Sequence, residues 1–98
     1  MLTANEAKKI GIRACIDKIG YDFCKEHEDN ATSAYSEVDG IMNCFVGVSD
    51  EPAPICDITK VDEIILTSGK KWPYSARCNV KMKDGTIEFL ECRVPTKL

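Results

Sequence analysis

The chain has 98 residues, 44% of them hydrophobic and 30% charged, which is the balance of one globular domain over residues 1–98 and excludes a disordered chain. The formal net charge of -3 argues against nucleic acid as a partner, because nucleic-acid-binding domains usually carry a basic face that shows in the total. No segment approaches the ~18 apolar residues of a membrane span, and the first residues lack the apolar core of a signal peptide. These features predict no membrane partner and a cytoplasmic protein, or a secreted one if a signal peptide has been removed.

The N-terminal segment is predicted to form one long helix. Thr3 and Glu6 have the spacing of a capping box, in which each side chain bonds the other residue's backbone N–H. Two apolar stripes follow at helical spacing. The stripe expected to face the core contains Ile12, Cys15, Ile16, Ile19 and Phe23. The second, expected to be partly covered or used in an interface, contains Ala7, Ile10, Ala14 and Tyr21. Gly20 either weakens the helix or ends it. Because the first stripe continues in phase to Phe23, we expect the helix to run to about residue 26.

Polar residues 25–33 are expected to form a loop, after which the pattern changes to that of strands. Residues 34–38 and 41–48 flank Asp39-Gly40, a strong hairpin signal, and the even residues from Met42 to Val48 share one face. A further strand is expected within residues 58–67.

The alternating residues 74–83 and the run after Asp84-Gly85 predict a final hairpin that extends to Val94. A two-residue loop would place Met82 opposite Ile87, Val80 opposite Phe89, and Cys92 opposite Arg77. Because the helix precedes the strands, the predicted fold class is α+β, with one long N-terminal helix packed on a curved antiparallel sheet of four to five strands.

Six cysteines are many for this length. The predicted register sets Cys92 on the face away from Cys78, and most of the cysteines have apolar neighbours, where free Cys acts as a small hydrophobe. The sequence therefore favours reduced cysteines, with at least one disulfide as the alternative.

No motif in the chain predicts a catalytic centre, a metal site or a cofactor. Cys24 and His27 have the gap of a zinc-ligand pair, but Cys44 and Cys56 are too far apart in sequence to be a second close pair. His27 as the base for a nucleophilic Cys lacks a local signature, and its flanking acids are typical of a solvated loop. We therefore expect the protein not to be an enzyme.

The segment around Trp72 mixes basic and aromatic residues, a composition that favours recognition of another protein. The predicted contact residues are Lys70, Lys71, Trp72, Tyr74 and Arg77. Trp72 itself is open to three interpretations: a place in the core, which is favoured since exposed Trp is unusual, contact with a partner protein, or stacking on nucleic-acid bases, which the negative net charge disfavours.

A helix followed by an antiparallel meander resembles the cystatin architecture over most of the chain. The segment Asn43-Cys44-Phe45-Val46-Gly47 falls where a cystatin carries Gln-x-Val-x-Gly, with Gly47 identical, and Trp72-Pro73 reverses the family's Pro-Trp pair. The resemblance implies that Gly47 and Trp72 enter a protease cleft, although a shared layout alone does not establish inhibition.

The sequence thus predicts a small non-enzymatic protein-binding or regulatory domain. The alternatives are a cystatin-like cysteine protease inhibitor and a small-ligand pocket between the helix and the concave sheet. Glu91 and Arg93, expected on the face of Ile87 and Phe89, are the polar candidates for that pocket. A homodimer through the sheet edge or the second helix stripe is a further prediction.

Overall fold

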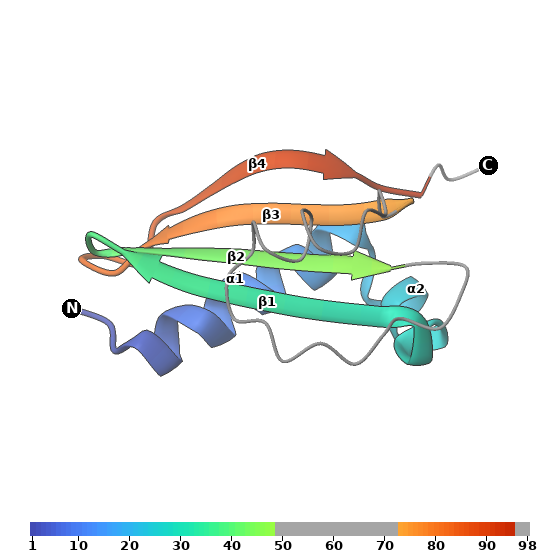
Figure 1. Cartoon of the computed structure of the whole chain (residues 1–98), viewed down its shortest axis with the longest axis horizontal. Coiled ribbons are helices and arrows are strands. Elements are labelled where there is room, and N and C mark those ends of the chain that lie inside the picture. The colour runs from blue at the N-terminus through green and yellow to red at the C-terminus, as the bar shows by residue number, and fades with distance from the viewer. Residues whose placement is uncertain (49–72, 96–98) are drawn as a thin grey trace.

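The computed structural model describes residues 1–48 and 73–95 of the chain. Helices α1 (Ala4–Ile19) and α2 (Tyr21–Glu26) are followed by the 3₁₀ turn η1 (Glu28–Asn30) and by four strands. The strands are β1 (Ala31–Val38), β2 (Ile41–Val48), β3 (Tyr74–Lys81) and β4 (Ile87–Arg93). They form one antiparallel sheet in the order β1-β2-β3-β4, and α1 lies across one face (Figure 1). The predicted α+β class is confirmed, whereas the strand expected within residues 58–67 lies outside the described residues.

The start of α1 is the predicted capping box. The Thr3 Oγ1 accepts a hydrogen bond from the Glu6 N–H at 3.1 Å, and the Glu6 Oε1 accepts one from the Thr3 N–H at 2.9 Å. Two backbone donors that a helix start leaves unpaired are thereby satisfied.

The predicted continuous helix to residue 26 is wrong, because the chain turns at Gly20. The φ angle of Gly20 is 129°, a value that side chains oppose and glycine tolerates. Its N–H still donates to the Ile16 carbonyl at 2.8 Å, and its own carbonyl accepts from the Cys24 N–H at 2.9 Å, so α2 restarts at once in a new direction. The loop expected over residues 25–33 is also wrong, since α2 and η1 occupy its first half and β1 begins at Ala31.

The helix face against the sheet differs from the predicted stripe. The buried positions of α1 recur every four residues and are Ala7, Gly11, Cys15 and Ile19. Ile12 and Ile16 are only half-buried at the side of this contact, and Ile10 and Tyr21 are exposed. A Cβ on Gly11 would overlap the Cys44 Sγ, so the helix approaches the sheet as closely as a glycine allows. Hydrophobic periodicity does not detect a contact made by such small residues.

The first hairpin has the predicted turn. Val38 faces Ile41, and Asp39 and Gly40 have φ angles of 51° and 77°, as a two-residue type I′ loop requires. The even residues of β2 (Met42, Cys44, Val46 and Val48) are buried, as predicted for one face. Phe45, on the opposite face, is also buried and only 2% exposed.

The second hairpin has a different register from the one predicted, since Val80 rather than Met82 faces Ile87. The Met82 N–H donates to the Gly40 carbonyl at 3.0 Å and the Met82 carbonyl accepts from the Leu2 N–H at 2.7 Å, so Met82 does not pair with β4. The loop is longer and only its Gly85 has positive φ, 78°. A slip of two residues keeps every side chain on its expected face.

A β-bulge in β4 then reverses the faces. Cys78 faces Phe89 and Ala76 faces Cys92. The two residues of β4 between Phe89 and Cys92 therefore lie opposite the single residue of β3 between Ala76 and Cys78. Cys92 therefore packs against the core, and its predicted place opposite Arg77 is wrong.

Candidate functional site

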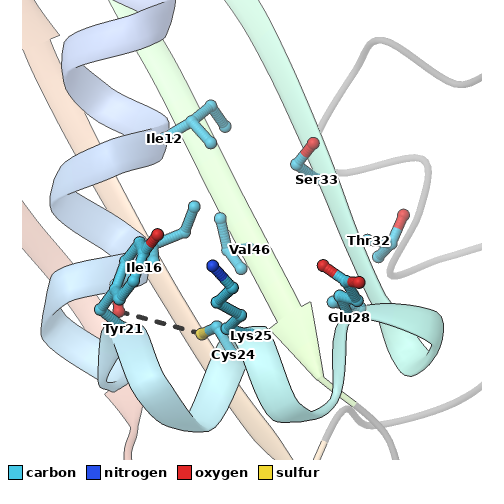
Figure 2. A pocket seen from close by; sticks show the side chains of 10 residues that line it. Ile12, Ile16, Tyr21, Cys24, Lys25, Glu28, Thr32, Ser33 and Val46 are labelled. Atoms are coloured by element: carbon cyan, nitrogen blue, oxygen red, sulfur yellow. Dashed lines mark hydrogen bonds between the residues drawn. The ribbon is translucent and has the colours of Figure 1, made fainter.

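A groove runs between α1, α2 and the edge strand β1. Because α1 packs mainly on β2 and β3, it leaves the side toward β1 open. Two hollows of about 380 and 310 Å³ follow one another there and share the residues Ile12, Ile16 and Ser33. We call this the α1–β1 groove, and Figure 2 shows its larger end, beside α2.

The floor of the groove is apolar. In Figure 2 the side chains of Ile12 and Ile16 extend from α1 into the space between the helix and the strands, and Val46 rises from β2. Val46 is buried, whereas both isoleucines are half-buried and retain apolar surface that neighbouring side chains do not cover. These isoleucines were predicted to face the core, and they lie at its margin because of the small-residue contact beside them.

The rim of the groove is basic. Among the described residues that line it, four are cations (Lys8, Lys9, Arg13 and Lys25) and one, Glu28, is a carboxylate.

Three of these cations lie over aromatic rings. The Lys8 Nζ lies 4.7 Å from the centre of the Tyr35 ring, and the Arg13 guanidinium lies 4.5 Å from that of Tyr21. The Lys25 Nζ lies 5.9 Å from the same Tyr21 ring. Arg13 also bonds Asp17 at 3.0 Å, an exposed pair that contributes little stability. The rim therefore presents positive charge above an apolar floor.

Strand β1 borders the groove with an edge that no described strand pairs. Val38 and Ile41 flank the two-residue turn as a hydrogen-bonded pair, so the even residues of β1 bond β2. The odd residues, Ala31, Ser33, Tyr35 and Glu37, then direct their N–H and C=O groups away from β2. Within residues 1–48 and 73–95, no strand pairs with that side.

The predicted protein-contact residues do not form one surface in the described part of the chain. Lys70, Lys71 and Trp72 lie outside the described residues. Tyr74 is half-buried on the core face, where its ring meets that of Phe23 edge-on at 5.0 Å. Side chains alternate between the two faces along β3, so Arg77 lies on the opposite face from Tyr74, in register with Phe45.

The predicted pocket residues Glu91 and Arg93 do not line the α1–β1 groove. Their side chains are 79% and 47% exposed and approach each other to 3.7 Å. The expectation that they share a face with Ile87 and Phe89 is wrong, because the β4 bulge turns them to the opposite side.

Cys24 and His27 are held by structural contacts. The His27 ring stacks on Phe23 with 4.3 Å between ring centres, and its Nδ1 lies 2.9 Å from the Phe23 carbonyl oxygen. The Cys24 Sγ approaches the Ile16 carbonyl at 3.9 Å, the contact dashed in Figure 2, and burial raises the pKa of this thiol. The described residues contain no group of three His, Cys, Asp or Glu side chains placed to hold a metal ion.

Three further cysteines meet in the core between α1 and the sheet. The Cys15 and Cys78 sulfurs are 3.6 Å apart, and the Cys78 Sγ lies 3.5 Å from the Gly11 carbonyl oxygen. Hydrogen bonding with Cys78 and burial raise the pKa of Cys15 and of Cys44 far above the ordinary thiol value. All five described cysteines are free, and these buried thiols pack as small hydrophobes.

Of the two residues that the cystatin resemblance implies for a protease cleft, Gly47 is inaccessible and Trp72 lies outside the described residues. Gly47 is buried inside β2, in register with Thr32 on one side and Ser75 on the other. The exposed turn of that hairpin is instead Asp39-Gly40.

No family model, curated protein or solved structure matches this chain. Neither described α-helix has the length and apolarity that crossing a membrane requires.

The sequence contained a signal for the α1–β1 groove that hydrophobic periodicity alone does not reveal. Lys9 and Arg13 are four residues apart and flank Ile12 and Ile16, so one side of the helix combines basic and apolar residues. Whether that side meets a strand or solvent depends on where the sheet lies, and the periodicity does not specify its place.

Proposed function

We propose that the protein is a small non-enzymatic binding domain that holds an extended segment of another protein in the α1–β1 groove. The observation that carries this proposal is the half-buried pair Ile12 and Ile16 beneath a rim of four cations. The chemistry that fits is a segment with apolar side chains for the floor and carboxylates for the rim.

The two parts of the groove contribute in different ways. Covering Ile12 and Ile16 removes apolar surface from water, which stabilises a complex by roughly 25 cal/mol for each Å² buried. The cations on the rim steer an acidic segment toward the groove and oppose a basic one, so they govern selectivity and association rate more than affinity. Loss of the floor is therefore expected to weaken all binding, and reversal of the rim to change which segments bind.

Selection from a library of displayed 12-residue peptides tests the proposal. Wild-type protein should enrich peptides in which Asp or Glu flanks apolar residues. The affinity of the best peptide, measured by calorimetry, should fall at least about tenfold in the variant Lys9→Glu/Arg13→Glu. Lys83→Glu, an exposed change in the loop between β3 and β4, is the control and should leave the affinity unchanged. Enrichment of basic peptides, or equal affinity in the rim variant, would contradict the proposal.

A small apolar anion is the second candidate ligand. The observation that favours it is the size of the larger hollow, about 380 Å³, which lies in the range of small-molecule sites. Laurate combines a carboxylate with an apolar chain and is a suitable probe. If laurate saturates one site and Ile16→Glu abolishes its binding while the peptide selection yields no groove ligand, the small-ligand function replaces the peptide function.

Cysteine protease inhibition is the remaining candidate function, and the burial of Gly47 does not support it. We expect micromolar protein to leave a papain-type protease fully active. Inhibition that is lost in Trp72→Ala would favour the inhibitor function over groove binding.

A further inference from the structure

We infer that two copies of this chain pair through their β1 edges in antiparallel fashion, so that their sheets become continuous. This inference does not depend on the proposed function, because it concerns the backbone edge of β1 rather than the floor of the groove beside it.

The two edge strands of the described sheet differ in a way that favours β1. An exposed, regular edge offers a row of unpaired N–H and C=O groups, and proteins often blunt such an edge with a bulge. The β4 edge carries the bulge between its pairings with Ala76 and Cys78. In contrast, β1 pairs with β2 in an unbroken register over all eight of its residues, so its outer side is regular as well. Among the described residues, nothing would need to rearrange for a further strand to be added to β1.

The charges around β1 select an antiparallel second copy. The end of the groove near Tyr35 is lined by Lys8 and Lys9. The opposite end, near Ala31, follows η1, whose Glu28 and Asp29 are exposed acids. Antiparallel pairing places the basic end of each copy beside the acidic end of the other, whereas parallel pairing would bring like charges together.

A specific register follows from the backbone. The backbone N–H and C=O groups that point away from β2 belong to the odd-numbered residues of β1. The odd-numbered residues of the two copies form hydrogen-bonded pairs when Ala34 lies opposite the partner's Ala34. Ala31 then faces the partner's Glu37, and Ser33 faces the partner's Tyr35. Lys25, which lines the groove beside Ala31, comes next to the exposed carboxylate of the partner's Glu37, and Lys9 comes next to that of the partner's Glu28.

Pairing also brings the two α1–β1 grooves to the same side of one sheet. The odd residues of β1 lie on the face of α1, as their partners Met42, Cys44, Val46 and Val48 do. The half-buried isoleucines of both copies then border one shared trough, which reduces the apolar surface that a single copy leaves open.

Sedimentation equilibrium of the full chain over a concentration series tests this inference. Wild-type protein should approach about twice the chain mass of 10.9 kDa as concentration rises. Ser33→Pro removes one outward N–H and leaves the β1–β2 hydrogen bonds in place, so it should remain monomeric with an unchanged far-UV circular dichroism spectrum. Ser33→Ala keeps that N–H and, as the matched control, should dimerise like the wild type.

A charge reversal provides a second test that does not alter the backbone. Lys9→Glu should raise the dimer dissociation constant at least about tenfold, and Lys9→Glu/Glu28→Lys should restore it because the opposite charges meet again across the interface. Wild-type protein that stays monomeric at all concentrations overturns the inference. A dimer that Ser33→Pro leaves intact, or a Lys9→Glu effect that Glu28→Lys does not reverse, also overturns it, since either result places the contact elsewhere.

Discussion

Replacement of Gly11 by alanine tests the close contact between α1 and the sheet. At an exposed helical site this change stabilises a protein by about 1 kcal/mol, because glycine is the poorer helix former. At Gly11 the added methyl would overlap the Cys44 Sγ and lie 3.0 Å from both the Cys44 Cβ and the Val80 Cγ2. Those two carbons belong to central strands, so the sheet cannot yield without breaking pairings on both sides.

The magnitude follows from the balance of these two effects. Overpacking a well-filled core costs about 1 to 3 kcal/mol, and here the contact lies between two backbone-anchored elements, at the upper end of that range. After the gain in helix propensity, Gly11→Ala should lower the free energy of unfolding by about 2 kcal/mol. For a domain of this size that corresponds to a loss of roughly 10 °C in Tm.

Urea denaturation followed by far-UV circular dichroism measures the effect, and Cys44→Ala tests its cause. Cys44→Ala alone should destabilise by about 1 kcal/mol through the loss of a buried sulfur. In the double variant Gly11→Ala/Cys44→Ala the two losses should partly cancel, with a favourable coupling of about 1 kcal/mol. If Gly11→Ala is as stable as the wild type, or if the two losses simply add, the contact is not the one described.

Three further predictions concern the turn, the helix cap and the thiols. Gly40→Ala should lower the free energy of unfolding by about 1 kcal/mol, because φ is 77° at Gly40 while no atom lies within 4 Å of an added Cβ. Gly40→Asn should lower it less, because Asn adopts positive φ more readily than Ala; equal losses would exclude a backbone origin. The hydrogen bonds from the Thr3 backbone and side chain lower the pKa of Glu6, so its contribution to stability is complete above the unfolded value of 4.5 and is lost as pH falls through the folded value. Glu6→Gln should therefore be less stable than the wild type at pH 7, and the two should converge in acid; a constant difference would mean that the Glu6 charge plays no part. All six cysteines should react with a thiol reagent in denaturant without reductant, while Cys15, Cys44 and Cys78 stay protected in the native protein; fewer than six reactive thiols would reveal a disulfide.

The two Asp-Gly turns show when local sequence is enough to predict a turn and when tertiary contacts change it. Asp39-Gly40 forms the predicted two-residue turn, with Val38 and Ile41 paired directly across it. Asp84-Gly85 lies in the same kind of pattern, but Met82 is held by Gly40 and Leu2, and the Asp84 carboxylate accepts from the Thr86 N–H at 2.9 Å. These contacts favour a longer loop.

The α1–β1 groove was not predicted, and the reason is again the packing of the helix. The sequence pattern assigned Ile12 and Ile16 to the core because they share one helical stripe with Ile19 and Phe23. The helix instead rests on Ala7, Gly11 and Cys15, since small residues permit the closer approach and the denser contact. The two isoleucines therefore lie beside the helix–sheet contact, where they form the floor of the groove.

By itself, the amino-acid sequence determined the features that depend on a few neighbouring residues: the capping box at Thr3, the helix that follows it, the alternation within β2 and β3, and the turn at Asp39. Each depends on backbone preferences and side-chain periods that act within one element. Only the tertiary structure decided which side of α1 meets the sheet, where β4 bulges, and which edge stays regular. Those features arise from the fit between elements distant in sequence. In the described part of this protein they create the groove and the regular β1 edge on which the two proposals rest.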